Sequence, residues 1–260
     1  MRYKVLCGYI RQRWDCGDTV EIEEKHTGKY GARGQTREKK RKATPEEIKK
    51  HNQWKRERDV RRLIKWNFRE RDYWITLTYP KDYRPTWEEM KDHAGKLVRK
   101  MREKYKKQGW TLKYIYRLAI GSRGGRHIHI LINRESNEKT ATDLIITDLW
   151  EQQWGHGHVN FRTTYSEGGY KQLAEYLTKP LEEWEPDEVK RYHPSRNLIR
   201  KDPEADEIKR RSLVDRDGKP RMPKAPKGYY VDPESIEVGI NPITHYAYRH
   251  YTLIKIKKRE

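Results

Sequence analysis

The chain has 260 residues, of which 33% are hydrophobic and 38% are charged. The hydrophobic share is low for a compact globule, so we expect a core of ordinary size to cover only part of the chain. Lysine and arginine number 59 against 39 aspartate and glutamate, a formal net charge of +20. This excess favours a phosphate-rich partner such as nucleic acid, and no apolar run of about 18 residues is present that would span a membrane.

The cysteines and aromatic residues narrow the class further. The two thiols, Cys7 and Cys16, fit a reducing compartment, and the first residues lack the apolar core of a secretory signal, so we expect a cytoplasmic protein. Tryptophan and tyrosine number 9 and 18, against only 2 phenylalanines. Rings of this kind stack on unpaired bases, although we expect most of them to fill the core and interfaces.

Residues 1–43 are polar and basic and are predicted to form an N-terminal arm, with short strands possible near residues 2–10 and 19–23. Like charges cluster in residues 37–42, and we predict that part of this run contacts DNA phosphates. The candidate contacts are Lys39, Lys40, Arg41 and Lys42. The alternative is a solvated tail.

Two capped helices are predicted next. Thr44, followed by a proline and by Glu47 three residues on, is typical of a helix start, and this helix should run over residues 44–68. Thr86 and Glu89 repeat the pattern before a helix that reaches about residue 105. The polar face of this second helix is rich in lysine and includes Lys100, so it is either a phosphate track or a solvated face.

The remaining pattern favours a sheet. Residues 73–79 are predicted to be a buried strand, and residues 112–120 and 126–133 an antiparallel hairpin joined by glycines. A helix over 141–154, a strand over 158–163 and a helix over 169–179 follow. This order predicts an α+β fold, an antiparallel sheet flanked by helices of the split βαβ, ferredoxin-like kind, in a core domain of residues 44–180. Residues 181–260 form a basic C-terminal extension that ends in strands.

Two histidines in the second hairpin strand carry the first chemical signal. Side chains alternate faces along a strand, so His127 and His129 point the same way while Ile128 and Ile130 point into the core. Two adjacent imidazoles on one face suit the binding of a divalent cation. The alternative is a pair of surface histidines on a half-exposed strand.

A tyrosine on the last core helix carries the second signal. Tyr176 and Lys179 are three residues apart and share a helix face, while Leu173 and Leu177 face the core. A neighbouring ammonium favours the phenolate, which is a competent nucleophile towards phosphorus. Taken alone, the segment fits an ordinary amphipathic helix equally well.

Taken together and in order, the motifs resemble the HUH endonuclease superfamily, and more closely the rolling-circle replication initiators of phages, plasmids and integrative elements. The resemblance spans roughly residues 60–200 and is carried by three motifs, with further similar pieces at 67–68, 154–159 and 195–198. The motifs are residues 75–79 (ITLTY), residues 127–129 (HIH) and residues 176–179 (YLTK).

The resemblance implies a metal site with one departure. Relatives carry a glutamate on the strand before the histidines as a third ligand, and here that position is occupied by Ala119. A third ligand would come from elsewhere or be water. His158 is our first candidate, with His156 and Glu175 as alternatives, and Mg²⁺ or Mn²⁺ is the implied cofactor.

The implied activity is sequence-specific nicking and joining of single-stranded DNA at a replication origin through a 5′-phosphotyrosine intermediate on Tyr176, with Lys179 stabilising charge. Arg123 and Arg126 flank the histidines and are predicted to contact DNA, and a host helicase and polymerase are the expected partners, with no membrane. The alternatives are a mobilisation relaxase with the same chemistry and a non-catalytic DNA-binding protein of the same fold.

Overall fold

The computed structural model describes residues 8–28, 42–165, 167–186, 190–241 and 244–256. The fold is α+β, as predicted, with two antiparallel sheets and, among these residues, four α-helices. None of the described helices is long and apolar enough to cross a membrane. The arm residues Lys39, Lys40 and Arg41 and the thiol of Cys7 lie outside the described residues.

The chain folds into two compact units, one formed by Gln53–Ile199 and the other by Met1–Asn52 together with Arg200–Glu260. The first unit contains a five-stranded sheet in the order β6-β3-β5-β4-β7, with every pair antiparallel. Its strands are β3 (Tyr73–Thr78), β4 (Tyr114–Ile120), β5 (Arg126–Ile132), β6 (Val159–Thr163) and β7 (His193–Pro194).

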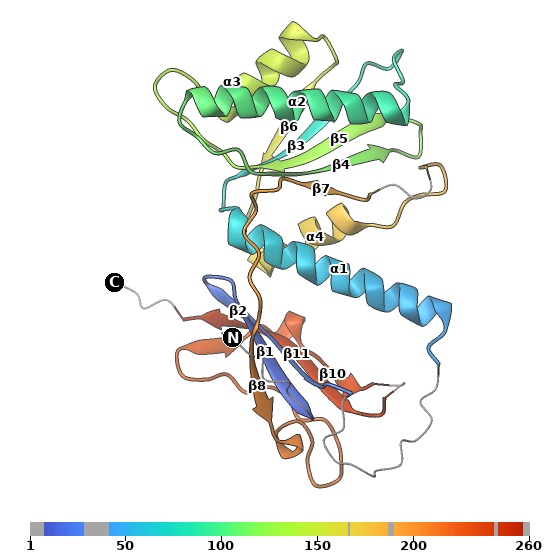
Figure 1. Ribbon diagram of the computed structural model, residues 1–260, viewed down its shortest axis with the longest axis vertical. Helices are drawn as coiled ribbons and strands as arrows, with labels where there is room; N and C mark the ends of the chain where they lie inside the picture. Colours follow the sequence, from blue (N-terminus) through green and yellow to red (C-terminus); the bar gives the residue numbers. More distant parts are fainter. Residues whose placement is uncertain (1–7, 29–41, 166, 187–189, 242–243, 257–260) are drawn as a thin grey trace. The chain divides into compact units, whose positions relative to one another are not determined.

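Helices cover both faces of this sheet (Figure 1). One face is covered by α2 (Trp87–Lys107), α3 (Thr142–Thr147) and the π-helical turn Asp148–Gln153. The other face is covered by α1 (Pro45–Asn67) and by α4 (Lys171–Thr178), which follows the 3₁₀ turn Glu167–Tyr170. The helix expected over 141–154 is therefore divided, because its second half widens into a π-helix around the fully buried Trp150.

The helix starts form as the sequence predicts. The Thr86 hydroxyl accepts a hydrogen bond from the Glu89 backbone N–H while the Glu89 carboxylate accepts one from the Thr86 N–H, which is a complete capping box at the start of α2. Thr44 and Glu47 make the same reciprocal pair before α1. Each cap satisfies amide groups that a helix start leaves unpaired.

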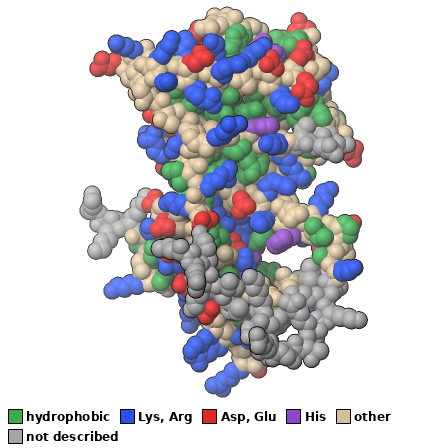
Figure 2. Space-filling model, viewed as in Figure 1, with side chains coloured by type: hydrophobic (Ala, Val, Ile, Leu, Met, Phe, Trp, Pro, Cys, Tyr) green, Lys and Arg blue, Asp and Glu red, His purple; other side chains and the backbone are tan. Residues whose placement is uncertain are grey.

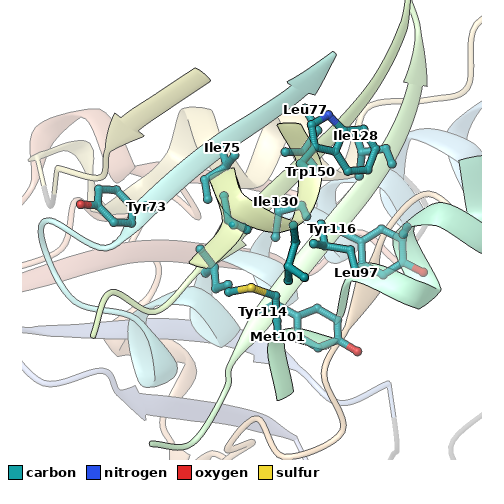
Figure 3. Packing of buried hydrophobic residues seen from close by; sticks show 14 of the residues in the cluster. Tyr73, Ile75, Leu77, Leu97, Met101, Tyr114, Tyr116, Ile128, Ile130 and Trp150 are labelled. Carbon is teal, nitrogen blue, oxygen red and sulfur yellow. The ribbon is translucent and has the colours of Figure 1, made fainter. Parts of the chain in front are cut away.

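The main core lies between the sheet and α2 (Figure 3). Alternate residues of β3 and β5 point into it, so that Ile75, Leu77, Ile128 and Ile130 are almost fully buried against Leu97 of α2. The opposite face packs a second cluster of α1 and α4 residues on the sheet. Because the side chains alternate, the residues between the buried isoleucines, including both strand histidines, face the α1 and α4 side.

The second unit is a sheet built from both ends of the sequence. Its strands run in the order β10-β11-β2-β1-β8, and β9 pairs with β11. Their bounds are β1 (Tyr9–Asp15), β2 (Thr19–His26), β8 (Glu204–Ile208), β9 (Tyr229–Val231), β10 (Glu237–Ile240) and β11 (Ala247–Lys255). Short 3₁₀ turns at Arg210–Ser212 and Pro233–Ser235 link them. The basic N-terminal segment and the C-terminal extension thus supply strands to one sheet.

The first strand lies later than the expected residues 2–10, because the β1–β2 turn fixes its register. Gly17 has a φ of 84°, a conformation that favours glycine, and its N–H donates to the Asp15 carboxylate at 2.9 Å. The tight turn places Asp15 opposite Val20 and sets the pairing of the strands from there.

A buried tyrosine hydroxyl tests the packing of α2 on the sheet. The Tyr105 hydroxyl donates to the Asn133 carbonyl at 2.8 Å and is hydrogen bonded with the Thr142 hydroxyl at 2.6 Å, and the side chain is fully buried. Tyr105→Phe removes one member of a buried network, so we expect the free energy of unfolding to fall by about 1–3 kcal/mol in urea denaturation. Tyr165→Phe, at a side chain that is 68% exposed, should leave it unchanged; equal losses in the two variants would contradict this assignment.

Candidate active site

The two strand histidines and the helix tyrosine meet on the α1 and α4 face of the sheet. The Tyr176 hydroxyl lies 2.6 Å from Nε2 of His129, and Tyr176 is 39% exposed. On the other side of the same ring, Nδ1 of His129 is hydrogen bonded with the Thr76 hydroxyl at 3.1 Å. A neutral imidazole donates through one nitrogen and accepts through the other, so both nitrogens of His129 are engaged.

Trp74 supports this arrangement from β3. Its ring stacks on His129 with a centroid distance of 5.6 Å and an interplanar angle of 9°, and it meets the Tyr176 ring edge-on at 5.6 Å. Contacts of these geometries hold ring planes in place. The histidine and the tyrosine are therefore oriented by aromatic packing as well as by their hydrogen bond.

His127 lies beside His129 with the ring centroids 6.0 Å apart. Its Nδ1 is buried and has no hydrogen-bond partner among the described residues. A Cβ added to Gly125 would lie 3.1 Å from its Nε2, and one added to Gly121 would lie 3.7 Å away, so the glycine hairpin leaves room for this ring. An unpartnered buried imidazole nitrogen is costly unless a ligand uses it.

Burial shifts both histidines towards the neutral form. Desolvation lowers the pKa of His129 to about 4, with smaller contributions from the charges of His127 and Arg117. Desolvation also lowers the pKa of His127. Neutral imidazoles are the form that accepts a hydrogen bond or binds a metal ion.

The cation that acts on Tyr176 is Arg117 and not Lys179. Burial raises the pKa of Tyr176, and the Arg117 charge opposes that rise. Lys179 follows the last residue of α4, has extended backbone angles, and forms an ion pair with Glu182. The spacing predicts that Lys179 shares a helix face with Tyr176 and favours its phenolate, but the helix ends at Thr178, so that geometry does not form.

Arg117 also fastens the tyrosine helix to the sheet. It pairs directly with His129 across β4 and β5, and its side chain is 4% exposed. Its Nη1 donates to three carbonyls at the end of α4, those of Tyr176 at 3.3 Å, Leu177 at 3.4 Å and Lys179 at 2.6 Å. These carbonyls have no helical partner, so a buried guanidinium satisfies them and favours the helix C-terminus.

Glu185 balances the charge of Arg117. The two side chains form an ion pair at 3.5 Å, and the Glu185 side chain is 1% exposed. The same carboxylate accepts hydrogen bonds from the backbone N–H groups of Ile120 at 3.1 Å and Glu182 at 3.0 Å. Glu185 is the buried acid of the site, and no motif singles it out in the sequence. A lone arginine in the apolar strand residues 114–120 was the one available signal, because a buried guanidinium needs a partner.

The position of the expected third ligand is as the sequence predicts, since Ala119 pairs directly with His127. His158 lies across β3, where its carbonyl accepts from the Thr78 N–H, and Thr78 stands between it and His127 in the sheet. Its side chain is 91% exposed and lies 3.9 Å from Glu151. Over the described part of the chain, no three His, Cys, Asp or Glu side chains gather where they could hold a metal ion.

The other candidate residues are more scattered. His156 stacks on His93 of α2 at 4.1 Å, among residues of the opposite sheet face, and Glu175 and the candidate contact Lys42 are exposed. Arg126 donates to the carbonyls of Pro85 and Gly124, whereas Arg123 is exposed at the hairpin tip.

The lysine-rich helix α2, which includes Lys100, covers the sheet face opposite the histidines. Lys100 pairs with Glu103 and Lys96 with Asp92, so acids interrupt the expected phosphate track. Acidic side chains lie among the basic ones over the top of the molecule in Figure 2.

The buried ion pair generates a stability prediction. Arg117→Met leaves Glu185 buried without its counter-charge, and we expect the free energy of unfolding to fall by about 3–5 kcal/mol. In the double variant Arg117→Met with Glu185→Met, part of this loss should be recovered. Urea denaturation of the four proteins of this cycle measures the coupling, and strictly additive losses would contradict a direct interaction.

Comparison with known proteins bears on the same segment. No curated protein and no solved structure matches the chain. Residues 72–181 match a family model described as a replication-associated protein of the ORF2 type. The matched stretch is less than half of the chain; it contains His127, His129 and Tyr176 and stops before Glu185. The unit that carries the candidate site is therefore similar to a replication-associated protein family.

Proposed function

We propose that this chain nicks and rejoins single-stranded DNA with Tyr176 as the nucleophile and so initiates rolling-circle replication, as in the HUH endonucleases that its motifs resemble. The observation that carries the proposal is the 2.6 Å contact between the Tyr176 hydroxyl and Nε2 of His129. It joins the tyrosine helix to the histidine strand, 47 residues apart in sequence. The family match supports a role in replication over one in mobilisation.

The chemistry is a transfer of one phosphodiester bond. The oxygen of Tyr176 attacks phosphorus in line, the Oη–P bond forms, and the bond from phosphorus to the 3′ oxygen breaks. The hydroxyl proton ends on the departing 3′ oxygen, and the 5′ phosphate stays on the tyrosine. Attack by a 3′ hydroxyl reverses the step, so joining needs no nucleotide. The charge of Arg117 favours the phenolate against the cost of burial, which raises the pKa of Tyr176.

A divalent cation, Mn²⁺ or Mg²⁺, would be held by His127 and His129. The fit rests on the unpartnered buried Nδ1 of His127 and on the lowered pKa of both rings. Such a cation supplies a Lewis acid for the phosphate oxygens. A cation on Nε2 of His129 would replace the Tyr176 hydrogen bond there, which would free the hydroxyl to turn to the phosphate.

The partners follow from the same proposal. The substrate is an origin in single-stranded form, and the sequence lacks the Gly-rich phosphate-binding motif of an attached helicase, so a host helicase and polymerase would complete replication. The second candidate function is DNA binding without cleavage. Ala119 beside His127 favours it, because a site with two protein ligands holds a metal weakly.

The nucleophile is tested with random-sequence single-stranded oligonucleotides and Mn²⁺. We expect a covalent adduct that carries label placed at the 3′ end of the DNA and no label placed at the 5′ end, since the tyrosine keeps the 5′ phosphate. Tyr176→Phe should abolish the adduct. Tyr170→Phe, which removes a half-buried hydroxyl whose pKa burial raises to about 12, should retain it. DNA binding with no adduct under any divalent metal would favour the binding protein instead.

The metal site is tested at Ala119. This residue pairs with His127 and is partly exposed, so Ala119→Glu adds a carboxylate beside the histidine. We expect the Mn²⁺ concentration for half-maximal adduct formation to fall about tenfold, because an added charged ligand tightens cation binding. Ala119→Gln provides the neutral control and should leave the concentration nearly unchanged. No difference between the two variants would place the cation elsewhere.

A further inference from the structure

Trp184 is an exposed indole that is nevertheless held in a fixed orientation. It is 49% exposed, and its Nε1–H donates to the carbonyl of Ile120 at 2.8 Å. The next residue, Glu185, is buried and accepts from the Ile120 N–H. The last residue of β4 is therefore bound on both its polar groups by this short segment, which fixes the indole at the end of the strand.

The indole lies beside the candidate active site. Ile120 directly follows Ala119, the residue paired with His127, and Gly121 comes close to Nε2 of His127. Trp184 makes no ring contact with another aromatic side chain in the described ranges. Its accessible surface is therefore not used by packing, and burial in the core does not explain its position.

Two exposed arginines lie on the adjoining hairpin tip. Nη1 of Arg84 approaches Gly124 so closely that a Cβ there would lie 2.8 Å away, and Arg123 is the neighbouring residue. Both side chains are exposed, and neither forms an ion pair with a carboxylate of the described residues. Uncompensated guanidinium groups beside an exposed ring suit a ligand with both phosphates and a flat apolar surface.

We propose that Trp184 is a stacking platform for one unpaired base of the DNA strand that enters the site, and that Arg84 and Arg123 contact the phosphates next to that base. The proposal rests on the proposed function, since it names the strand-binding subsite of that centre. Every base presents a flat face, so this contact adds affinity without reading the sequence. It predicts that the site holds its substrate beside the scissile phosphate even where no base is specifically recognised.

The test compares two probes in equilibrium binding measured by fluorescence anisotropy. One is single-stranded oligo(dT) of about 12 nucleotides, within the range of sites that bind such strands, and the other is an abasic strand of the same length. All proteins carry Tyr176→Phe, so binding is measured without cleavage. We expect Trp184→Ala to weaken oligo(dT) binding about tenfold and to leave abasic binding unchanged. Trp184→Phe, which keeps a ring, should lose less, and Arg123→Gln should weaken both probes.

Equal weakening of both probes by Trp184→Ala, or no weakening of either, would overturn the proposal. Tyr230→Ala, at an exposed aromatic residue of the other sheet (48% exposed), is the matched control and should not change the ratio between the probes. The preference for bases over an abasic strand is independent of covalent chemistry. A failure of the adduct experiment and a failure of this one are therefore separate results.

Discussion

The candidate site depends on one buried guanidinium. Arg117 lies on β4 beside His129, and its hydrogen bonds to the end of α4 bring the tyrosine helix onto the histidine strand. A charge in such a position is costly unless it is paired and its hydrogen bonds are satisfied, and Glu185 with the free helix carbonyls meets both requirements. The placement of Tyr176 against His129 follows from this contact between the helix end and the sheet.

Much of the scaffold could be predicted from local patterns. Capping residues located the starts of α1 and α2, and strict alternation located the faces of β3 and β5. The register of the β4–β5 hairpin followed from its glycines, which is why Ala119 could be placed beside His127 from the sequence alone. Helix spacing likewise placed Leu177 in the core, with Tyr176 beside it on the exposed side.

The remainder depends on contacts that no local pattern encodes. Glu185 lies in a charged stretch where several acids are equally spaced, and only the fold shows which of them meets Arg117. Lys179 has the right spacing, but the helix ends one residue too early for it to use that spacing. The pairing of β1 and β2 with β11 joins opposite ends of the chain, and such pairing is set by the whole sheet rather than by either segment.

The central claim is that the phenolic oxygen of Tyr176 becomes bound to DNA. The most direct measurement is mass spectrometry of peptides after incubation with single-stranded DNA and Mn²⁺, followed by nuclease digestion. The account predicts one modified peptide, containing residues 170–179, with a 5′-linked nucleotide on Tyr176. A nucleotide on Tyr170 or on a residue outside this helix, or an unmodified peptide from protein that has cut the DNA, would contradict it.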